Sequence, residues 1–255
     1  MNEGPVYHRL VVVKKERGGG FLLLIDPDRA PERVYLPLVE AAEECGVDAI
    51  LVGTSFMVHT NFHGSVRKIR AATSLGVILF PGSYAQITPD ADAILFTSLI
   101  SGRNASYLIE EQVRGAPLVK QFGLEPIPTG YMLIESNTLT SVQYVSNTHP
   151  IPRTKNDVAR AHALAAQYLG MKLVYLEAGS GSGQPVPEEM VRAVASYVDI
   201  PLLVGGGLTT PEMCAARVEA GASFIVVGNG LENDPRFTLL RELTVACHPK
   251  ESVCA

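Results

Sequence analysis

The stretch P201LLVGGGLTTPEMCAARVEAGASFIVV227 contains one complete strand–helix–strand unit. Its two short runs, P201LLV204 and S223FIVV227, are apolar on both faces, which is typical of parallel strands covered by helices. Between them, T210PEMCAARVEAG221 has proline in its first turn and ends at glycine, the usual punctuation of a helix. The unit therefore predicts an α/β fold with a parallel sheet.

The same alternation recurs along the rest of the chain. The other strand candidates are F21LLLI25, A49ILV52, V77ILF80, A93ILF96, P128TGYMLI134 and K172LVYL176. The other helix candidates are P31ERVYLPLVEAAEECG46, V158ARAHALAAQYLG170 behind a capping box of Thr154 and Asp157, and P187EEMVRAVASYV198. Eight strands with interleaved helices predict a single (β/α)8 (TIM) barrel domain over residues 1–255, with frayed termini at about 1–5 and 247–255. A doubly wound open sheet is the alternative.

One connection breaks the pattern. Only P81GSYAQITPDAD92 separates the third and fourth strand candidates, and it is too short and too rich in proline for a full crossover helix. We therefore predict a modified barrel with one outer helix missing or reduced near strand three. An apolar side groove would result.

Composition excludes several classes of protein. The formal charge is −5 without a basic cluster, which argues against a nucleic-acid surface. No apolar stretch is long enough to cross a bilayer, and the N-terminal residues lack the order of a signal peptide. Cysteines 45, 214, 247 and 254 form no CxxC pair, so neither a zinc site nor a disulfide framework is indicated. We expect a cytoplasmic protein.

Glycine-rich turns follow the last three strand candidates. They are E177AGSGSG183, G205GGLTTPE212 and G228NG230. Glycine lets the backbone approach a phosphate, and successive amides and helix N-termini form an anion-binding surface. Three such turns on consecutive strands predict a phosphate site at the carboxyl end of the barrel, where the working groups of such barrels lie.

The early strands carry a different chemistry. Asp26 ends the first strand candidate, with Asp28 two residues later, and Thr54 and Ser55 follow the second. A carboxylate with hydroxyls and no Cys or His suits a hard cation such as Mg²⁺ shared with ligand phosphates. Alternatively, Asp26 only caps a turn. The segment T97SLISGRN104 could likewise bind a second anion or cap the helix that begins near Asn104.

Several residues of types that often bind metals or substrates are expected to be structural. His59 and His63 are four residues apart, but no acidic pattern such as HExxH accompanies them, and His162 lies on a helix. Tyr131 and Tyr175 lie on strand candidates, which predicts core or pocket-wall positions with hydroxyls that could contact a substrate.

Taken in order, the motifs resemble those of a known family. LIDPD, VGTSF, LFPGS, EPIPTGYMLIE, YLEAGSG, VGGGL with TPE, and VVGNG are similar to motifs of geranylgeranylglyceryl phosphate synthases, a family that includes bacterial heptaprenylglyceryl phosphate synthases. The resemblance extends from about Phe21 to Leu231. It implies a modified barrel that transfers a prenyl group from a polyprenyl diphosphate to the 3-hydroxyl of sn-glycerol 1-phosphate, with Mg²⁺, to form an ether.

The resemblance also implies roles for individual residues. Asp26 and Ser55 match the metal ligands, and Thr54 stands where the family pattern Gly-Gly-Ser has its second glycine, so it could share that role. Glu177 is the best-placed base for the attacking hydroxyl. The implied contacts of the glycerol phosphate are Tyr175, Leu176, Glu177, Ala178, Gly179, Ser180, Gly181, Gly205, Gly206, Gly228 and Asn229, with Gly207 as a neighbour. The segment around Ser101, Gly102 and Asn104 resembles the part of the family on the pyrophosphate side.

Geranylgeranyl diphosphate is the expected donor, because EPIPTGYMLIE is closer to the geranylgeranyl-using members; heptaprenyl diphosphate is the alternative. A homo-oligomer, dimer or larger, is expected from the family. Two rivals stay open. One is a sugar-phosphate isomerase or aldolase, for which Lys120 is the nearest Schiff-base candidate and Lys172 should face the opposite rim. The other is a phosphate-binding barrel without catalysis.

Overall fold

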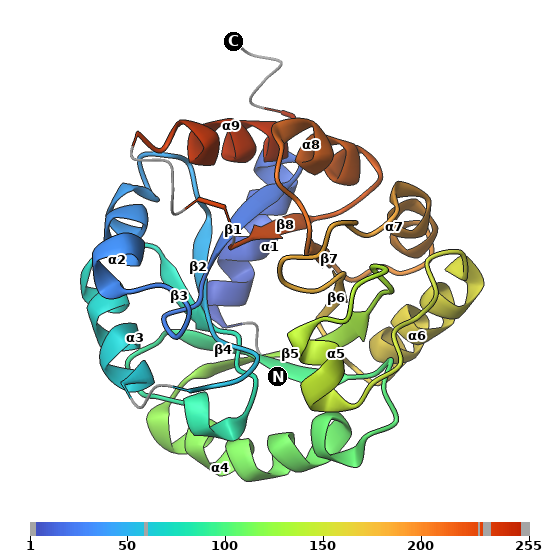
Figure 1. Ribbon diagram of the computed structural model, residues 1–255, viewed down its shortest axis with the longest axis horizontal. Coiled ribbons are helices and arrows are strands. Elements are labelled where there is room, and N and C mark those ends of the chain that lie inside the picture. The colour runs from blue at the N-terminus through green and yellow to red at the C-terminus, as the bar shows by residue number, and fades with distance from the viewer. Residues whose placement is uncertain (1–3, 59–60, 229, 232–235, 251–255) are drawn as a thin grey trace.

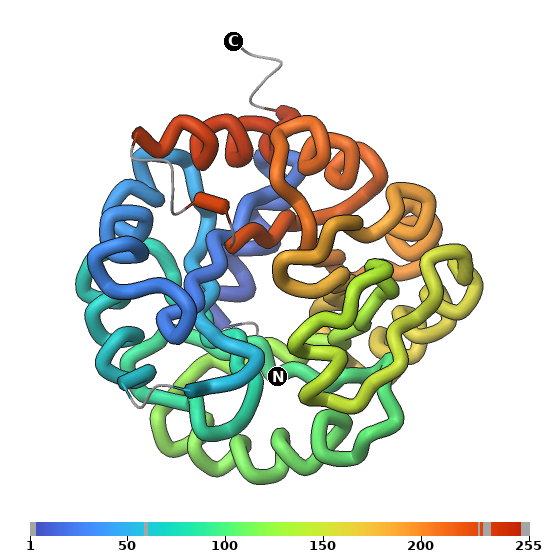
Figure 2. Tube along the Cα trace, in the orientation of Figure 1, coloured from blue at the N-terminus to red at the C-terminus, as the bar shows by residue number. Residues whose placement is uncertain are grey.

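Eight parallel strands form a closed barrel in the computed structural model, which describes residues 4–58, 61–228, 230–231 and 236–250 (Figure 1). The strands follow one another in sequence order and β8 pairs with β1, so the colours run once around the barrel in the Cα tube of Figure 2. They are β1 Gly20–Ile25, β2 Ala49–Val52, β3 Gly76–Leu79, β4 Ala93–Leu99, β5 Glu125–Leu133, β6 Leu173–Glu177, β7 Leu202–Gly205 and β8 Phe224–Val227. The predicted barrel is confirmed, and the doubly wound alternative is wrong.

Helices surround the strands as an outer ring (Figure 1). They are α2 Glu32–Ala41, α3 Phe62–Ala71, α4 Glu111–Phe122, the short α5 Ser141–Ser146, α6 Asn156–Tyr168, α7 Glu188–Ala195, α8 Pro211–Glu219 and α9 Thr238–Cys247. The hydroxyl of Thr210 caps α8 by accepting the Met213 amide at 3.3 Å. The predicted capping box before α6 is wrong, because the N-cap is Lys155 and no side chain caps the helix.

The connection between β3 and β4 contains only the 3-10 turn Tyr84–Gln86 (η1) among the described residues, as predicted from its length. After β4, the chain forms a wide π turn, Ser106–Glu110 (η2), that leads directly into α4. Among the described residues, no α-helix therefore lies between β3 and β4 in the chain.

Successive side chains of each strand point to opposite faces, which divides the apolar residues into two cores. On β1, Leu22 belongs to a cluster inside the barrel, whereas Leu23 belongs to a cluster between the strands and the outer helices. Both side chains are fully buried. This period of two is what a strand covered on both faces requires.

Helix α1, Pro5–Arg17, precedes β1 and was not predicted. Its buried residues Tyr7 and Leu10 pack into the core inside the barrel, so α1 closes the end opposite the strands' carboxyl ends. In Figure 1 the helix lies behind the strands, within the outer ring. Only two of its residues are buried, so the sequence carries no long apolar stripe that would have indicated a helix.

The N-terminus of α1 is held by a carboxylate from the start of β5. The Glu125 side chain accepts the amides of Val6 at 2.7 Å and Tyr7 at 2.9 Å. We expect Glu125→Ala to lower the free energy of unfolding by about 1–3 kcal/mol, because two amides of the first turn lose their charged acceptor. Urea denaturation measures it, with exposed Glu242→Ala on α9 as the matched control; equal stabilities would contradict the role.

The packed structure continues past the predicted C-terminal boundary at residue 247. Cys247 and His248 are buried, and His248 Nε2 lies 3.0 Å from Oδ2 of the buried Asp48. The amide of Lys250 donates to the carbonyl of Arg17 at the end of α1. Among the described residues, no helix is long and apolar enough to cross a membrane.

Candidate active site

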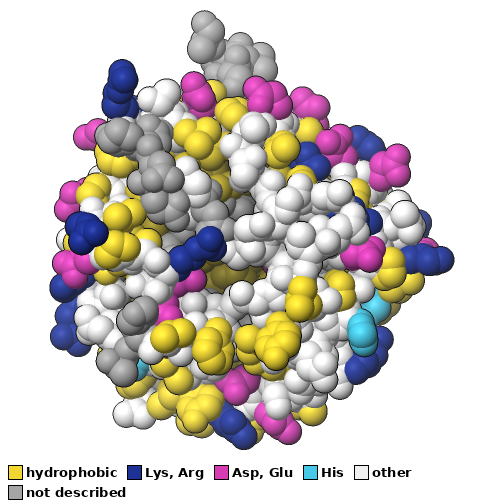
Figure 3. Space-filling view, viewed as in Figure 1, with side chains coloured by type: hydrophobic (Ala, Val, Ile, Leu, Met, Phe, Trp, Pro, Cys, Tyr) yellow, Lys and Arg dark blue, Asp and Glu magenta, His cyan; other side chains and the backbone are white. Residues whose placement is uncertain are grey.

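A cavity of about 290 Å³ opens at the carboxyl ends of the strands, the face seen in Figure 3. The figure shows a hollow at the centre of this face, with hydrophobic side chains gathered on one side of it. Residues that follow β1, β2, β3, β6, β7 and β8 line the cavity. Parallel strands bring these segments together because all of their carboxyl ends point to one face.

Glu177 is the last residue of β6 and lies in the wall of this cavity. Its side chain is buried, and Oε1 accepts the amide of Gly179 at 2.6 Å. Burial raises the pKa of the carboxyl to about 7, while the hydroxyl of Tyr175 and the amide of Gly179 act in the opposite direction. A carboxylate with this pKa can accept a proton near neutral pH, which suits a general base.

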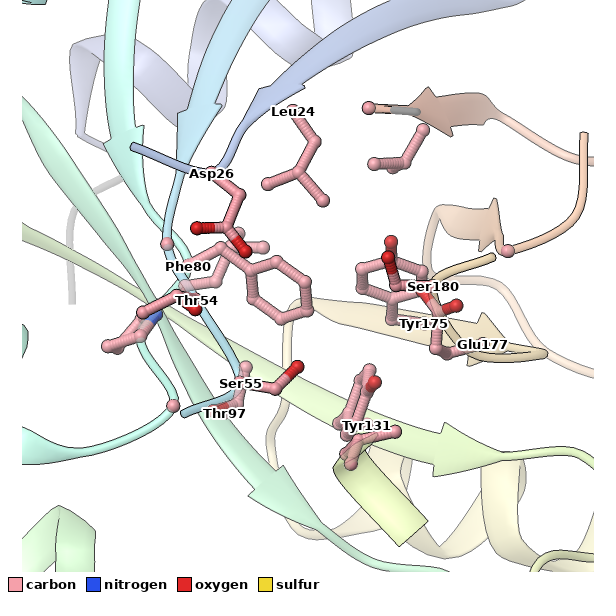
Figure 4. Close-up of a pocket in the computed structure, with 18 of the residues that line it drawn as sticks. Leu24, Asp26, Thr54, Ser55, Phe80, Thr97, Tyr131, Tyr175, Glu177 and Ser180 are labelled. Carbon is pink, nitrogen blue, oxygen red and sulfur yellow. The ribbon is translucent and has the colours of Figure 1, made fainter. Parts of the chain in front are cut away.

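Three aromatic rings lie beside Glu177 (Figure 4). Phe80 stacks on Tyr175 with ring centroids 5.2 Å apart, and Tyr131 meets both rings edge-on at 5.7 and 5.4 Å. Burial, with Glu177 as a further cause, raises the pKa of both tyrosines well above the usual value, so both are neutral. The Tyr175 hydroxyl makes no hydrogen bond of ordinary geometry, although it lies close enough to Glu177 to lower its pKa. The prediction of pocket-wall tyrosines is confirmed.

The glycine turns after β6 and β7 pack against each other. Gly179, Gly181, Gly206 and Gly207 all have positive φ, the left-handed region that favours glycine. A Cβ at Gly206 would lie 2.3 Å from Glu177 Oε1 and 2.7 Å from the Gly179 amide nitrogen. The absence of a side chain at 206 therefore lets the two turns meet around the carboxylate.

The residues predicted to contact glycerol phosphate divide into two groups. Those that line the cavity are Tyr175, Glu177, Ser180, Gly181, Gly206 and Gly228, together with the neighbour Gly207. Leu176 and Ala178 are fully buried in the core beneath the outer helices, so their side chains point away from the cavity. Gly179 and Gly205 support the wall through Glu177 and Tyr175 without lining it. Asn229 lies outside the described residues.

Two arginines that sequence reasoning missed hold the chain that follows the β6 turn. Arg217 on α8 is buried and donates from Nε and Nη2 to the carbonyl of Val186, both at 3.2 Å. Arg153 donates from Nη2 to the carbonyl of Pro185 at 2.9 Å. A hydrogen bond from a side chain to a carbonyl far away in the chain leaves no local sequence pattern, so the sequence could not have indicated the roles of these two arginines.

Asp26 lies on the opposite side of the cavity from Glu177 (Figure 4). Its Oδ1 accepts the amides of Asp28 at 3.0 Å and Arg29 at 3.2 Å, so it does cap the turn after β1. Burial raises its pKa, whereas these amides and the side chain of Thr54 lower it. The two readings of Asp26 are therefore compatible, because the same carboxyl both shapes its turn and faces the cavity.

The residues on this side fit a magnesium ion that is shared with phosphates. One carboxylate and the hydroxyls of Thr54 and Ser55 line the same side of the cavity, Thr54 buried and Ser55 exposed. No group of three His, Cys, Asp or Glu that could hold a metal occurs among the residues the structure describes. Such a partial set of hard oxygen donors is typical of Mg²⁺ sites that a phosphate ligand completes.

The cavity continues from this side toward the β3–β4 connection. Ile94 and Phe96, on the face of β4 that points away from the barrel, line it together with Tyr84 and Ile87 of the β3–β4 connection. The predicted apolar groove is thus present. Tyr107 of η2, with Glu111 and Gln112 at the start of α4, completes this wall. These residues were missed, because the sequence did not indicate that this part of the chain approaches the groove.

The residues that follow β4 make local structural contacts. The Ser101 hydroxyl accepts the Leu133 amide, and Asn104 Oδ1 accepts the Ser106 amide at the start of the π turn. Arg103 folds back on the carbonyl of Gly102, and none of these four residues lines the cavity. The assignment of Ser101, Gly102 and Asn104 to the pyrophosphate side is therefore not supported.

The histidines and lysines lie away from the cavity. His63 Nε2 bonds with the Ala85 carbonyl, and His162 Nδ1 with the Val158 carbonyl, so both are structural as expected; His59 lies outside the described residues. Lys172 Nζ lies over the Tyr7 ring at the closed end of the barrel. Among described residues, no lysine or arginine lines the cavity, which removes the Schiff-base rival.

Comparison with known proteins places this geometry in a family. A model of the PcrB family matches residues 11–246. The chain belongs to the PcrB family. Relatives of this PcrB-family chain include a geranylgeranylglyceryl phosphate synthase from Spirosoma linguale, 46% identical over 84% of this chain and 86% of the relative. The synthase of Pyrococcus horikoshii is 47% identical over 86% of each. These names confirm the resemblance inferred from the motifs.

Solved structures agree with the family. The PcrB-family fold superposes on (S)-3-O-geranylgeranylglyceryl phosphate synthase from Thermoplasma acidophilum, in complex with its substrate sn-glycerol-1-phosphate, with a TM-score of 0.90 and 36% identity. That match covers 97% of this chain and 100% of the other. A thiamine phosphate pyrophosphorylase from Pyrococcus furiosus shares the fold alone, with a TM-score of 0.61 at 15% identity.

Proposed function

We propose that this PcrB-family protein transfers a prenyl group, geranylgeranyl as the expected one, from its diphosphate to the 3-hydroxyl of sn-glycerol 1-phosphate. One observation carries the proposal. A single cavity has the buried carboxylate of Glu177 beside glycine turns on one side, Asp26 with two hydroxyls on the other, and an apolar groove that leads away. This arrangement matches the three parts of the reaction: an acceptor with a phosphate, a diphosphate leaving group and a prenyl tail.

The acceptor side is built from the turns after β6, β7 and β8. Ser180, Gly181 and Gly206 line this part of the cavity, and left-handed glycines expose main-chain amides that suit a phosphate. A phosphate held there would place a three-carbon alcohol within reach of Glu177. The relative from Thermoplasma acidophilum was solved with sn-glycerol-1-phosphate, which supports this acceptor.

The chemical step is a displacement at the allylic carbon. The 3-hydroxyl oxygen forms a bond to that carbon, the bond from the carbon to the diphosphate oxygen breaks, and the hydroxyl proton passes to Glu177. A Mg²⁺ ion, when bound, offsets the charge of the departing diphosphate. Asp26, Thr54 and Ser55 would hold it, and the cavity walls hold both reactants in one orientation, which lowers the barrier by positioning.

The groove accounts for the apolar tail. Ile87, Ile94 and Phe96 offer apolar surface, and a buried CH₂ group contributes about 0.8 kcal/mol. The names of the relatives favour a geranylgeranyl donor. Heptaprenyl diphosphate is the alternative donor for the same groove.

The direct test is incubation with labelled sn-glycerol 1-phosphate, Mg²⁺ and prenyl diphosphates of several lengths. We expect an ether product and free diphosphate, with most product from the geranylgeranyl donor. More product from the heptaprenyl donor would overturn the donor assignment, and no ether from any donor would overturn the proposed function.

We expect Asp26→Asn to raise the Mg²⁺ concentration needed for half-maximal activity by about tenfold or more, because a neutral amide is a poorer ligand for a hard cation. Asparagine keeps the oxygen that accepts the Asp28 and Arg29 amides, so the turn should survive. A Mg²⁺ titration measures the change, with Asp28→Asn on the same turn as the control. An identical Mg²⁺ response in Asp26→Asn and the parent would exclude Asp26 as a ligand.

A further inference from the structure

We propose that Gln86 is a positioning residue that fixes the donor side of the cavity against the prenyl groove. The inference rests on the proposed function and assigns a role to the 3-10 turn that replaces an outer helix. Gln86 is the last residue of this turn and is 1% exposed. It does not line the cavity, so it would act through the residues that it holds.

The side-chain amide of Gln86 joins two loops. Its Oε1 accepts the amides of Thr54 at 3.2 Å and Gly82 at 3.3 Å, and its Nε2 donates to the carbonyl of Thr54 at 2.8 Å. Thr54 follows β2 and Gly82 follows β3, and both line the cavity. A buried amide with three main-chain partners is costly to disturb, because a buried donor or acceptor that loses its partner keeps the cost of its removal from water.

The same two loops are in close backbone contact. A Cβ at Gly53 would lie 1.7 Å from the carbonyl oxygen of Phe80, and a Cβ at Gly82 would lie 2.4 Å from that of Thr54. The loops therefore pack without side chains between them. The Gln86 side chain bridges them by pairing with both polar groups of the Thr54 backbone and with the Gly82 amide.

This bridge sets the distance between two parts of the donor. On one side it holds the backbone of Thr54, which lines the cavity together with Asp26 where the diphosphate would lie. On the other side, Tyr84 and Ile87 flank Gln86 in the chain and line the groove for the tail. Gln86 thus ties the diphosphate end of the cavity to the start of the groove, which would place the allylic carbon above the Phe80 ring between Asp26 and Glu177 (Figure 4).

The test compares the two ligands in binding, without turnover. Gln86→Glu keeps the shape of the side chain but sets a carboxylate oxygen against the Thr54 carbonyl. We expect it to weaken binding of geranylgeranyl thiolodiphosphate with Mg²⁺ by about tenfold or more, measured by calorimetry. Binding of sn-glycerol 1-phosphate alone should change by less than about twofold, because the acceptor side belongs to β6, β7 and β8. Exposed Gln121→Glu on α4 is the matched control for charge.

A second variant guards against a folding defect. Gln86→Asn introduces no buried charge and only shortens the reach of the amide, so it should fold and show the same selective loss for the donor. Equal weakening of both ligands, or no weakening of the donor, would overturn the positioning role. Failure of the proposed function would look different, since the parent protein itself would then make no ether with any donor.

Discussion

Glu177→Gln should lower kcat by about 10²–10⁴-fold, the range that a general base contributes. Glutamine keeps an oxygen to accept the Gly179 amide, so the turn after β6 should hold its shape. The variant loses only the ability to take a proton from the 3-hydroxyl. Steady-state kinetics measure kcat, and calorimetry with sn-glycerol 1-phosphate should show binding within about threefold of the parent, or tighter where the lost charge had repelled the phosphate.

The pH dependence of kcat/KM provides a second test of the role of Glu177. The pKa of Glu177 is raised to about 7 by burial, so the carboxyl is increasingly protonated, and inactive as a base, as the pH falls below that value. In the parent, kcat/KM should therefore fall on the acid side of about pH 7. A phosphate monoester takes up its second proton near pH 6, so the profile of Glu177→Gln serves as the baseline for the substrate.

The matched control is Glu111→Gln, which removes one negative charge from the groove side of the same cavity. Glu111 accepts the Tyr84 amide, a bond that glutamine can keep, so kcat should change by less than about tenfold. If Glu177→Gln turned over at the parent rate, Glu177 would not be the base. Equal losses in the two variants would point to net charge and not to proton transfer.

Gly206→Ala is expected to be a severely damaging single-methyl change, because the added group would meet the Glu177 carboxylate itself. The added Cβ would lie 2.3 Å from Glu177 Oε1 and 2.7 Å from the amide of Gly179, and Gly206 has φ of +83°. Either the carboxylate or the turn must move. Displacement of a reacting group by about 1 Å costs on the order of 10²-fold in rate, so kcat/KM should fall by at least that factor.

Gly183→Ala provides the comparison within the same segment. A Cβ there meets nothing within 4 Å, and Gly183 is not among the glycines with positive φ. Its kinetics should match the parent, whereas thermal melting of Gly206→Ala should also show a loss of about 1 kcal/mol from the left-handed backbone. If Gly206→Ala had the same kcat/KM as the parent, catalysis would not depend on the exact position of the Glu177 carboxylate.

The sequence was most informative where a signal is local. Most of the β-strands are short apolar runs with glycine, proline or a charged residue beside them, and all eight candidates are strands. The missing helix after β3 is indicated by the short length and the prolines of the connection P81GSYAQITPDAD92. The turns after β6 and β7 were evident from glycine, because a positive φ at Gly179 or Gly206 requires that residue type.

What escaped prediction depends on tertiary contacts. Gln86, Arg153 and Arg217 act by hydrogen bonds to main-chain atoms of distant loops, which have no residue-type signature. Which of Thr54 and Ser55 is exposed is set by the backbone of the loop after β2, and the structure shows Thr54 buried and Ser55 exposed. The failed capping box at Thr154 matched a pattern of residue types, but α6 begins one residue later than that cap would require.

The order of the strands has a consequence for how this barrel can change. The cavity residues that we propose for the diphosphate and the prenyl tail come mainly from the first half of the chain, Asp26 to Gln112, and those proposed for glycerol phosphate from Tyr175 to Gly228. Donor binding and acceptor binding would therefore depend on different halves of the barrel. Exchange of one half-barrel between relatives would then change the preferred donor and leave acceptor recognition in place. Prenyl chain length would thus diverge among lineages that all use the same glycerol phosphate.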